Sequence, residues 1–122
     1  MPVYKLKTFA RFARDERIES ARLIDAIQRA SDGLVDADLG GGLIKQRVAR
    51  QGHGRRGGYR VLIAFHSKDF SVFLYGFAKS QRENLEPKEL RVVQQLAAKW
   101  LGANAQEIRQ ALAGGQLIEV EQ

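Results

Sequence analysis

The stretch that decides the fold runs from Leu43 to Arg82 and reads LIKQRVAR (43–50), QGHGRRGG (51–58), YRVLIAFHS (59–67), KD (68–69) and FSVFLYGFAKSQR (70–82). The first, third and fifth segments have the apolar–polar alternation and β-branched or aromatic content that is typical of strands. The glycine-rich second segment and the short fourth one separate them as a loop and a tight turn. The sequence therefore predicts three consecutive antiparallel strands.

Positive charge is concentrated in the first part of this stretch. Residues 43–60 contain no carboxylate and six basic side chains, Lys45, Arg47, Arg50, Arg55, Arg56 and Arg60. The rest of the chain has 14 basic and 14 acidic residues, so these six equal the whole net charge of +6. A basic sheet on a neutral scaffold favours an anionic partner: nucleic acid, an acidic protein or an anionic surface.

Strand alternation assigns side chains to faces. The shared faces predicted in this way are Lys45 with Arg47, Arg60 with His66, and Tyr75 with Phe73, Phe77 and Lys79. The register between the strands decides whether these three faces coincide, and alternation alone leaves that open.

Helices are predicted before and after the three strands. The expected elements, in order, are a strand at Val3–Leu6, a helix capped by Thr8, a helix ending at 31–33, the three strands, a helix from Pro87 to Gly102, a helix capped by Asn104, and a last strand in QLIEVE (116–121). This order predicts an α+β fold, with a small twisted antiparallel sheet, N-terminal helices on one face, C-terminal helices and a short final strand.

Length and composition narrow the class further. The 122 residues fit one domain, 1–122, with a core at about 3–101 and a C-terminal extension at 102–122. Cysteine is absent, and the two histidines lie on different predicted elements, so we expect no disulfide, no metal and no cofactor. We see no apolar run of about 20 residues and no secretory signal, and we expect a cytoplasmic protein that has no membrane partner.

Three segments carry a resemblance to a known family: LGGGLIKQRVAR (39–50), GGYRVLIAF (57–65) and FLYGFAKSQREN (73–84). In this order and spacing they resemble the RelE/HigB-like toxins of bacterial type II toxin–antitoxin systems, and most closely a subgroup with GGGL-x-K-x-R and YGFAK segments. The resemblance covers about 3–101. The family fold, a small twisted antiparallel sheet with two N-terminal helices, agrees with the predicted element order.

The resemblance implies a function. Such toxins are ribosome-dependent endoribonucleases that cut messenger RNA and stop translation, without a metal or small-molecule cofactor. The ribose 2′-hydroxyl attacks the adjacent phosphate and leaves a cyclic phosphate, which requires a base, an acid and cations for the phosphorane. The implied partners are a cognate antitoxin, the ribosome and messenger RNA.

The resemblance also suggests catalytic residues. Lys45 and Arg47 match the basic pair of the family's second strand, Arg60 its GYR-type arginine, and Lys79 the first basic residue after the fourth strand, while Arg82 lies near a further one. The provisional roles are Lys45 or Lys79 as base, Arg47 and Arg60 on the phosphate, and Arg82 or His66 near the leaving group.

A second group of residues is predicted to bind RNA. His53, Arg55 and Arg56 would form a phosphate-contacting arm, Tyr75 could stack on bases, and Arg50 and His66 complete the predicted RNA-binding residues. The alternatives are an ordinary solvated sheet face for the cations, a strand-end histidine for His66 and a core position for Tyr75.

The chain departs from the family pattern at the residue expected to act as general acid, which protonates the leaving 5′-oxygen. Several relatives have a C-terminal tyrosine or histidine, but neither residue occurs here after Tyr75, and Ser80 and Gln81 stand where many relatives have another basic residue. Two other functions therefore stay open, a ParE-like inhibitor of DNA gyrase and a non-catalytic nucleic-acid-binding module. An antitoxin could cover the basic sheet or the outside of the N-terminal helices. QLIEVE could pair with a sheet edge, its acids near the basic face.

Overall fold

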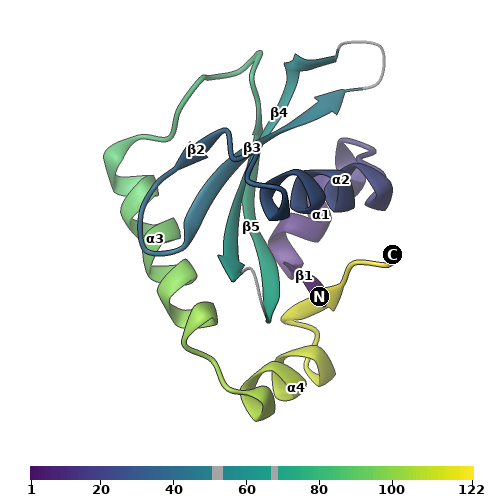
Figure 1. Cartoon of the computed structure of the whole chain (residues 1–122), viewed down its shortest axis with the longest axis vertical. Coiled ribbons are helices and arrows are strands. Elements are labelled where there is room, and N and C mark those ends of the chain that lie inside the picture. The colour runs from purple at the N-terminus through teal and green to yellow at the C-terminus, as the bar shows by residue number, and fades with distance from the viewer. Residues whose placement is uncertain (51–53, 67–68) are drawn as a thin grey trace.

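The computed structural model describes residues 1–50, 54–66 and 69–122, with the backbone alone at 54–56 (Figure 1). Its elements are β1 (Val3–Leu6), α1 (Lys7–Asp15), α2 (Ser20–Ser31), β2 (Ala37–Asp38), β3 (Leu43–Arg50), β4 (Gly54–His66), β5 (Phe70–Ala78), α3 (Pro87–Leu101), α4 (Ala105–Ala113) and β6 (Leu117–Glu119). The predicted α+β class is confirmed. The two-residue strand β2 was not predicted, because it lies in a glycine-rich connector.

The strands form one mixed sheet in the order β2-β3-β4-β5-β1-β6. Its neighbours are antiparallel except for β1 and β5, which run parallel. The predicted sheet was antiparallel throughout. The difference arises because β1 lies between β5 and β6, two strands that come much later in the chain, so no hairpin sets its direction.

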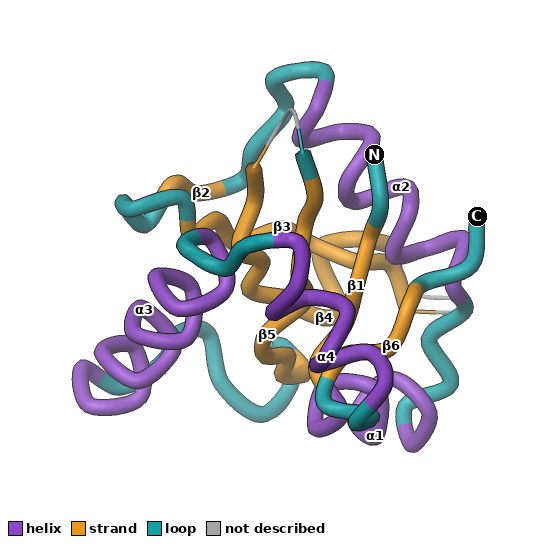
Figure 2. Tube along the Cα trace, turned by 90° about the horizontal axis from the view of Figure 1, so that it is seen from below, coloured by secondary structure: helices purple, strands orange, loops and turns teal. Residues whose placement is uncertain are grey.

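Helices cover both faces of the sheet (Figure 2). On one face, α1 and α2 contribute Phe9 and Leu23 to a core that includes Ile63 and Phe73 from the strands. On the opposite face, α3 and α4 build a second core, whose largest members include Trp100, Leu62, Leu74, Ile108 and Leu117. The N-terminal helices therefore lie on one face as predicted, and the C-terminal helices lie on the other.

A buried glutamine connects α2 to the sheet. Gln46 on β3 is fully buried, and its amide nitrogen donates to the carbonyl oxygens of Ala26 (3.0 Å) and Leu34 (3.1 Å). Its side-chain oxygen accepts from the backbone N–H of Asp36 at 2.7 Å. The Asp36 carboxylate in turn accepts from the backbone N–H of Arg47 at 2.6 Å. This network orients the segment that leads into β2 against the basic strand β3.

Strand β4 is longer than predicted. The expected loop 51–58 is strand from Gly54 onward, with Arg50 paired to Gly54 across an irregularity in β3. The physical reason lies at Gly58, where a Cβ atom would stand 2.1 Å from the carbonyl oxygen of Val48, so only glycine lets the two backbones approach. The paired ends of β3 and β4 consequently extend beyond α1 and α2 (Figure 1). His53 of the predicted arm lies outside the described residues.

A bulge in β5 changes the predicted faces. Tyr75 pairs with Leu62, whereas Phe73 pairs with Ile63, so Leu74 is the extra residue. Phe73 consequently joins the core under α1 and α2, and Tyr75 and Phe77 face α3. The predicted common face of Phe73, Tyr75 and Phe77 was therefore wrong at Phe73, because the alternation had assumed an unbroken strand.

The remaining expectations concern the ends of elements. Helix α1 begins at Lys7 with Leu6 as its N-cap, not at Thr8. Asn104 caps α4 as predicted, and its side chain accepts from the backbone N–H of Glu107 at 2.8 Å. QLIEVE does pair with a sheet edge through β6, but that edge lies beyond β1, away from β3 and β4, so its acids are not near the basic residues. None of the helices in the described part has the length and apolar character to span a membrane.

Candidate functional site

The strand register brings the predicted cations together. Arg47 on β3 lies opposite Arg60 on β4, which lies opposite Phe77 on β5. Two residues along each strand, on the same face, Lys45, Leu62 and Tyr75 form a second row. Neighbouring strands are about 4.8 Å apart, so the Arg47 and Arg60 backbones are direct neighbours. The three strand faces predicted to carry Lys45 with Arg47, Arg60, and Tyr75 with Lys79 are therefore on the same side of the sheet. We call the surface formed by Lys45, Arg47, Arg60 and Lys79 the basic face.

A pocket of about 230 Å³ opens on this face, lined by Arg47, Arg60, Lys79, Glu83 and Asn84. We call it the basic pocket. Lys45 reaches its rim, because its ammonium nitrogen donates to the Asn84 side-chain oxygen at 2.9 Å. Lys79 is fixed at its backbone, where its N–H donates to the Gly58 carbonyl oxygen at 3.1 Å. Four of the five predicted catalytic residues thus line or adjoin one pocket.

Arg60 forms the buried side of this pocket. It is only 7% exposed, and its guanidinium donates to the backbone oxygen of Tyr59 at 3.3 Å. Burial lowers the pKa of Arg60 and the charge of Arg47 lowers it further, whereas Asp36 and Glu83 oppose the change. An arginine side chain keeps its charge in proteins, so the pocket presents a fixed cation next to a second one.

Arg82, the fifth predicted catalytic residue, is held at the border of the basic face. Its guanidinium donates to the Glu89 carboxylate and to the Tyr75 hydroxyl, each at 2.6 Å. It also lies over the Phe77 ring, 5.3 Å from the centroid. The hydrogen bond to Glu89 raises the pKa of Arg82 and lowers that of Glu89. Arg82 therefore anchors the β5–α3 connection to the sheet, and Tyr75 is half-buried beneath it.

Two of the predicted RNA-binding residues lie elsewhere. His66 is six residues along β4 from Arg60, about 20 Å in an extended strand, and its ring nitrogen lies 3.4 Å from the Asp69 carboxylate. Arg50 lies with Tyr59 on the opposite face, its guanidinium 6.0 Å from the ring centroid. His53 and the side chains of Arg55 and Arg56 fall outside what the structure describes.

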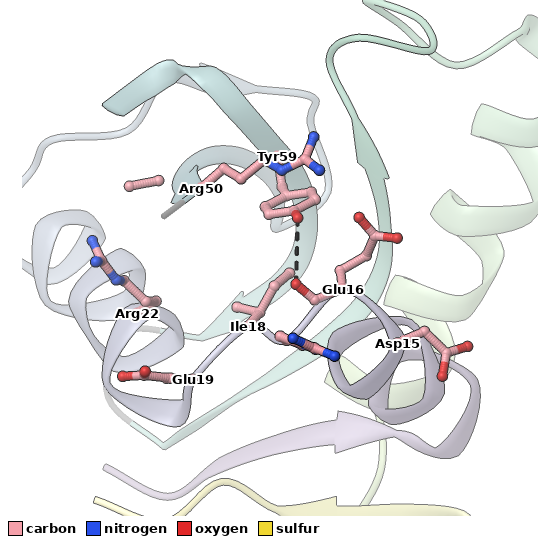
Figure 3. Close-up of a pocket in the computed structure, with 9 residues that line it drawn as sticks. Asp15, Glu16, Ile18, Glu19, Arg22, Arg50 and Tyr59 are labelled. Carbon is pink, nitrogen blue, oxygen red and sulfur yellow. Dashed lines mark hydrogen bonds between the residues drawn. The ribbon is translucent and has the colours of Figure 1, made fainter. Parts of the chain in front are cut away.

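Arg50 belongs instead to a second pocket, of about 510 Å³, between the α1–α2 turn and the β3–β4 hairpin (Figure 3). The Tyr59 hydroxyl donates to the Glu16 carbonyl oxygen at 3.4 Å across this pocket, and burial raises the pKa of Tyr59. The lining mixes both signs of charge: Asp15, Glu16 and Glu19 with Arg17, Arg22 and Arg50. Because successive residues of β4 face opposite ways, this pocket is separate from the basic one.

Sequence reasoning missed two residues of the basic pocket, Glu83 and Asn84. Both lie in the connection between β5 and α3, where no periodicity assigns a side chain to a face. The available signal was their position directly after Arg82 in the segment FLYGFAKSQREN. In the described part of the chain, no group of three or more His, Asp or Glu side chains could hold a metal ion.

Two guanidinium groups, two lysines and a carboxylate on an open sheet surface can bind and act on a phosphodiester. Comparison with known proteins gives an independent indication. A family model described as the RelE toxin of the RelE / RelB toxin-antitoxin system matches residues 1–120. No curated protein matches the chain.

Proposed function

The chain belongs to the RelE toxin family, which makes it a toxin with an antitoxin as its partner, and from this premise we propose that it stops translation by cutting messenger RNA on the ribosome. The observation that carries the proposal is the basic pocket, where Arg47, Arg60 and Lys79 converge with Lys45 at the rim. A surface that only attracts RNA by its charge does not require several cationic side chains to line the same pocket.

In the proposed reaction, Arg47 and Arg60 bind the scissile phosphate. The ribose 2′-hydroxyl attacks the phosphorus, and the two guanidinium groups stabilise the negative charge that develops on the phosphate oxygens. Arg60 is suited to this role because its burial limits its motion, so its charge needs little reorganisation when the phosphorane forms. The products are a cyclic phosphate and a free 5′-hydroxyl.

Lys45 and Lys79 are the proposed proton-transfer groups. Lys45 lies on β3 and Lys79 directly follows β5, and Asn84 orients Lys45. Arg82 is proposed to act at the border, where it holds the Tyr75 ring in a position to contact a base. A role for His66 at the leaving group is not supported, because it lies at the far end of β4.

The proposed setting is the cytoplasm, where the ribosome and messenger RNA are available. The cognate antitoxin is proposed to neutralise the toxin by covering the basic face, since an acidic segment would find the surplus positive charge there. The outside of α1 and α2 is the alternative docking surface.

The proposal is tested by induced expression in a bacterial host, with mapping of messenger RNA 5′ ends. The variant to compare is Lys45→Ala/Arg47→Ala, because Arg47 is exposed and Lys45 only partly buried, so the fold should survive. A matched control is Lys88→Ala/Arg91→Ala, which removes the same charge from the exposed side of α3. We expect growth arrest with new in-frame cuts in wild type and control, and loss of both in the variant.

One observation favours a second candidate, a ParE-like inhibitor of DNA gyrase. The chain has no tyrosine or histidine after Tyr75, so the side chain that would protonate the leaving group in several relatives is absent. Growth arrest without new RNA ends, relieved by overproduction of gyrase, would support this candidate and reject the nuclease. Soluble protein without arrest would favour a binding module.

A further inference from the structure

The basic pocket contains a carboxylate that the reaction scheme has not used. Among the described residues that line the pocket, Glu83 alone carries an acidic side chain. Burial and the charge of Arg47 lower the pKa of Arg60, and the charge of Glu83 acts in the opposite direction. A carboxylate beside two guanidinium groups requires an explanation, because it reduces the attraction of the pocket for a phosphate.

The position of Glu83 is fixed by its neighbours in the chain. Arg82 is tied to Tyr75 and Glu89, each at 2.6 Å. Asn84 is tied to Lys45 at 2.9 Å. Glu83 therefore lies between two anchored residues: Arg82, which is bound to β5 and α3, and Asn84, which is bound to β3. This arrangement holds the carboxylate at the pocket while its side chain stays exposed to solvent.

We propose that Glu83 is the proton acceptor for the 2′-hydroxyl, an inference that rests on the nuclease function proposed above. Carboxylates are ionised at neutral pH and ready to accept a proton, whereas lysine ammonium groups are protonated and ready to donate one. The pocket offers both kinds of group side by side. Glu83 and the lysines then divide the two proton transfers, and the acid that the chain was expected to lack is a lysine.

The step is balanced as follows. The Glu83 carboxylate takes the proton of the 2′-hydroxyl as its oxygen forms a bond to phosphorus. The bond from phosphorus to the 5′-oxygen breaks, and that oxygen takes a proton from the ammonium group of Lys79 or Lys45. Solvent later removes the proton from Glu83 and returns one to the lysine, so the site is restored.

The first test compares Glu83→Gln with Glu121→Gln in single-turnover cleavage of messenger RNA on ribosomes. Both variants make the same chemical change at an exposed position, but Glu121 is far from the pocket in sequence and lies outside the strands. We expect Glu83→Gln to cleave about 10²- to 10⁴-fold more slowly and Glu121→Gln to match wild type. Added formate should restore part of the rate to Glu83→Ala, because a small carboxylate can enter the open pocket. Wild-type cleavage by Glu83→Gln, or a slow Glu83→Ala without rescue, would overturn the assignment.

The second test separates the base from the acid. In a messenger RNA whose 5′-leaving oxygen is replaced by sulfur, the leaving group departs without being protonated. Removing the general acid should therefore not slow cleavage of this substrate, whereas removing the general base still should. We expect Glu83→Gln to stay slow on this substrate and Lys79→Ala to approach wild type. A normal rate for Glu83→Gln on the sulfur substrate would place Glu83 on the leaving-group side and reject the proposal. If the wild-type protein cuts neither substrate, the proposed nuclease function itself is rejected, which is a different outcome from rejection of the Glu83 assignment alone.

Discussion

At the scale of single residues, hydrogen-bond partners hold cations on the basic face and at its border. Asn84 binds the Lys45 ammonium on the face, and Glu89 together with Tyr75 binds the Arg82 guanidinium at the border. On the opposite side of β3, Gln46 is held by three backbone partners. Strand β3 thus carries cations on one face and, on the other, a buried amide whose three hydrogen bonds connect the strand to α2 and to the segment after it.

Gln46→Leu tests this connection. The replacement keeps the volume but leaves two carbonyl oxygens and one N–H without their side-chain partner, so we expect the free energy of unfolding to fall by about 1–3 kcal/mol. Urea denaturation measures the change. Gln95→Leu, the same substitution at an exposed site on α3, should change stability little. An equal effect of both would show that the buried network contributes nothing specific.

At the scale of elements, the sequence predicted most strands and helices, because alternation, Pro87 and the Asn104 cap are local signals. What it could not predict depended on distant partners. The Gly54–Gly58 extension of β4 exists because β3 lies beside it, and the bulge at Leu74 appears only in the pairing with β4. Glu83 and Asn84 were missed for the same reason, since a connection reaches the site only through contacts made elsewhere.

The packing of α1 on β5 depends on a glycine. A Cβ atom at Gly76 would stand 2.5 Å from the Phe12 ring, so Gly76→Ala should lower the free energy of unfolding by about 1–3 kcal/mol. In the Phe12→Ala background the added methyl group has space, and the cost should shrink by about 0.5–3 kcal/mol. A double-mutant cycle in urea measures this coupling. Additive effects of the two changes would contradict the close approach of α1 to β5.

The attachment of the β5–α3 connection should depend on pH. The Arg82 hydrogen bond lowers the pKa of Glu89, so the folded state keeps this carboxylate charged at a pH where the unfolded chain protonates it. The stabilisation is then complete above about pH 4.3 and is lost as the pH falls through the lowered pKa. Urea midpoints from pH 2.5 to 7 should therefore show wild type above Glu89→Gln near neutrality, with the two converging in acid. A gap that stays constant with pH would contradict this, and Glu19→Gln serves as an exposed control.

At the scale of the whole molecule, the excess positive charge is concentrated in one hairpin, whereas the apolar cores that stabilise the fold extend over the whole sheet. The net charge of +6 equals the basic residues of one hairpin, while the two cores extend across both faces of the sheet. The proposed binding to RNA should therefore depend strongly on salt concentration, whereas the free energy of unfolding should depend on it much less. Helix α4 and β6 also contribute to the second core, and we propose that residues 104–122 are an integral part of the domain.

Salt dependence measures the contribution of the basic face. For a short single-stranded RNA, Arg47→Gln should reduce the slope of log affinity against log salt concentration by about 0.7, the value for one lost phosphate contact. Arg91→Gln on α3 removes the same charge and should leave the slope unchanged. Equal effects of the two variants would mean that total charge, not the basic face, governs binding.

The role of the C-terminal segment is tested at β6. Leu117 is 1% exposed and its neighbour Ile118 is 38% exposed. Leu117→Ala should lower the free energy of unfolding by about 2–5 kcal/mol, whereas Ile118→Ala should cost far less. Thermal or urea denaturation distinguishes them. A small effect at Leu117 would show that this segment is a dispensable addition.

The place of β1 between β5 and β6 affects how the protein is synthesised. Its register partners are Ser71–Phe73 on one side and Leu117–Glu119 on the other, so the first strand made is the last that can complete its pairing. While the chain leaves the ribosome, the β3–β4 and β4–β5 hairpins can form from local contacts, but β1 must wait for nearly the whole sequence. The pairing of β1 with β6 therefore follows the formation of both hairpins, and a polypeptide that stops before Leu117 would leave β1 as an exposed edge strand beside β5.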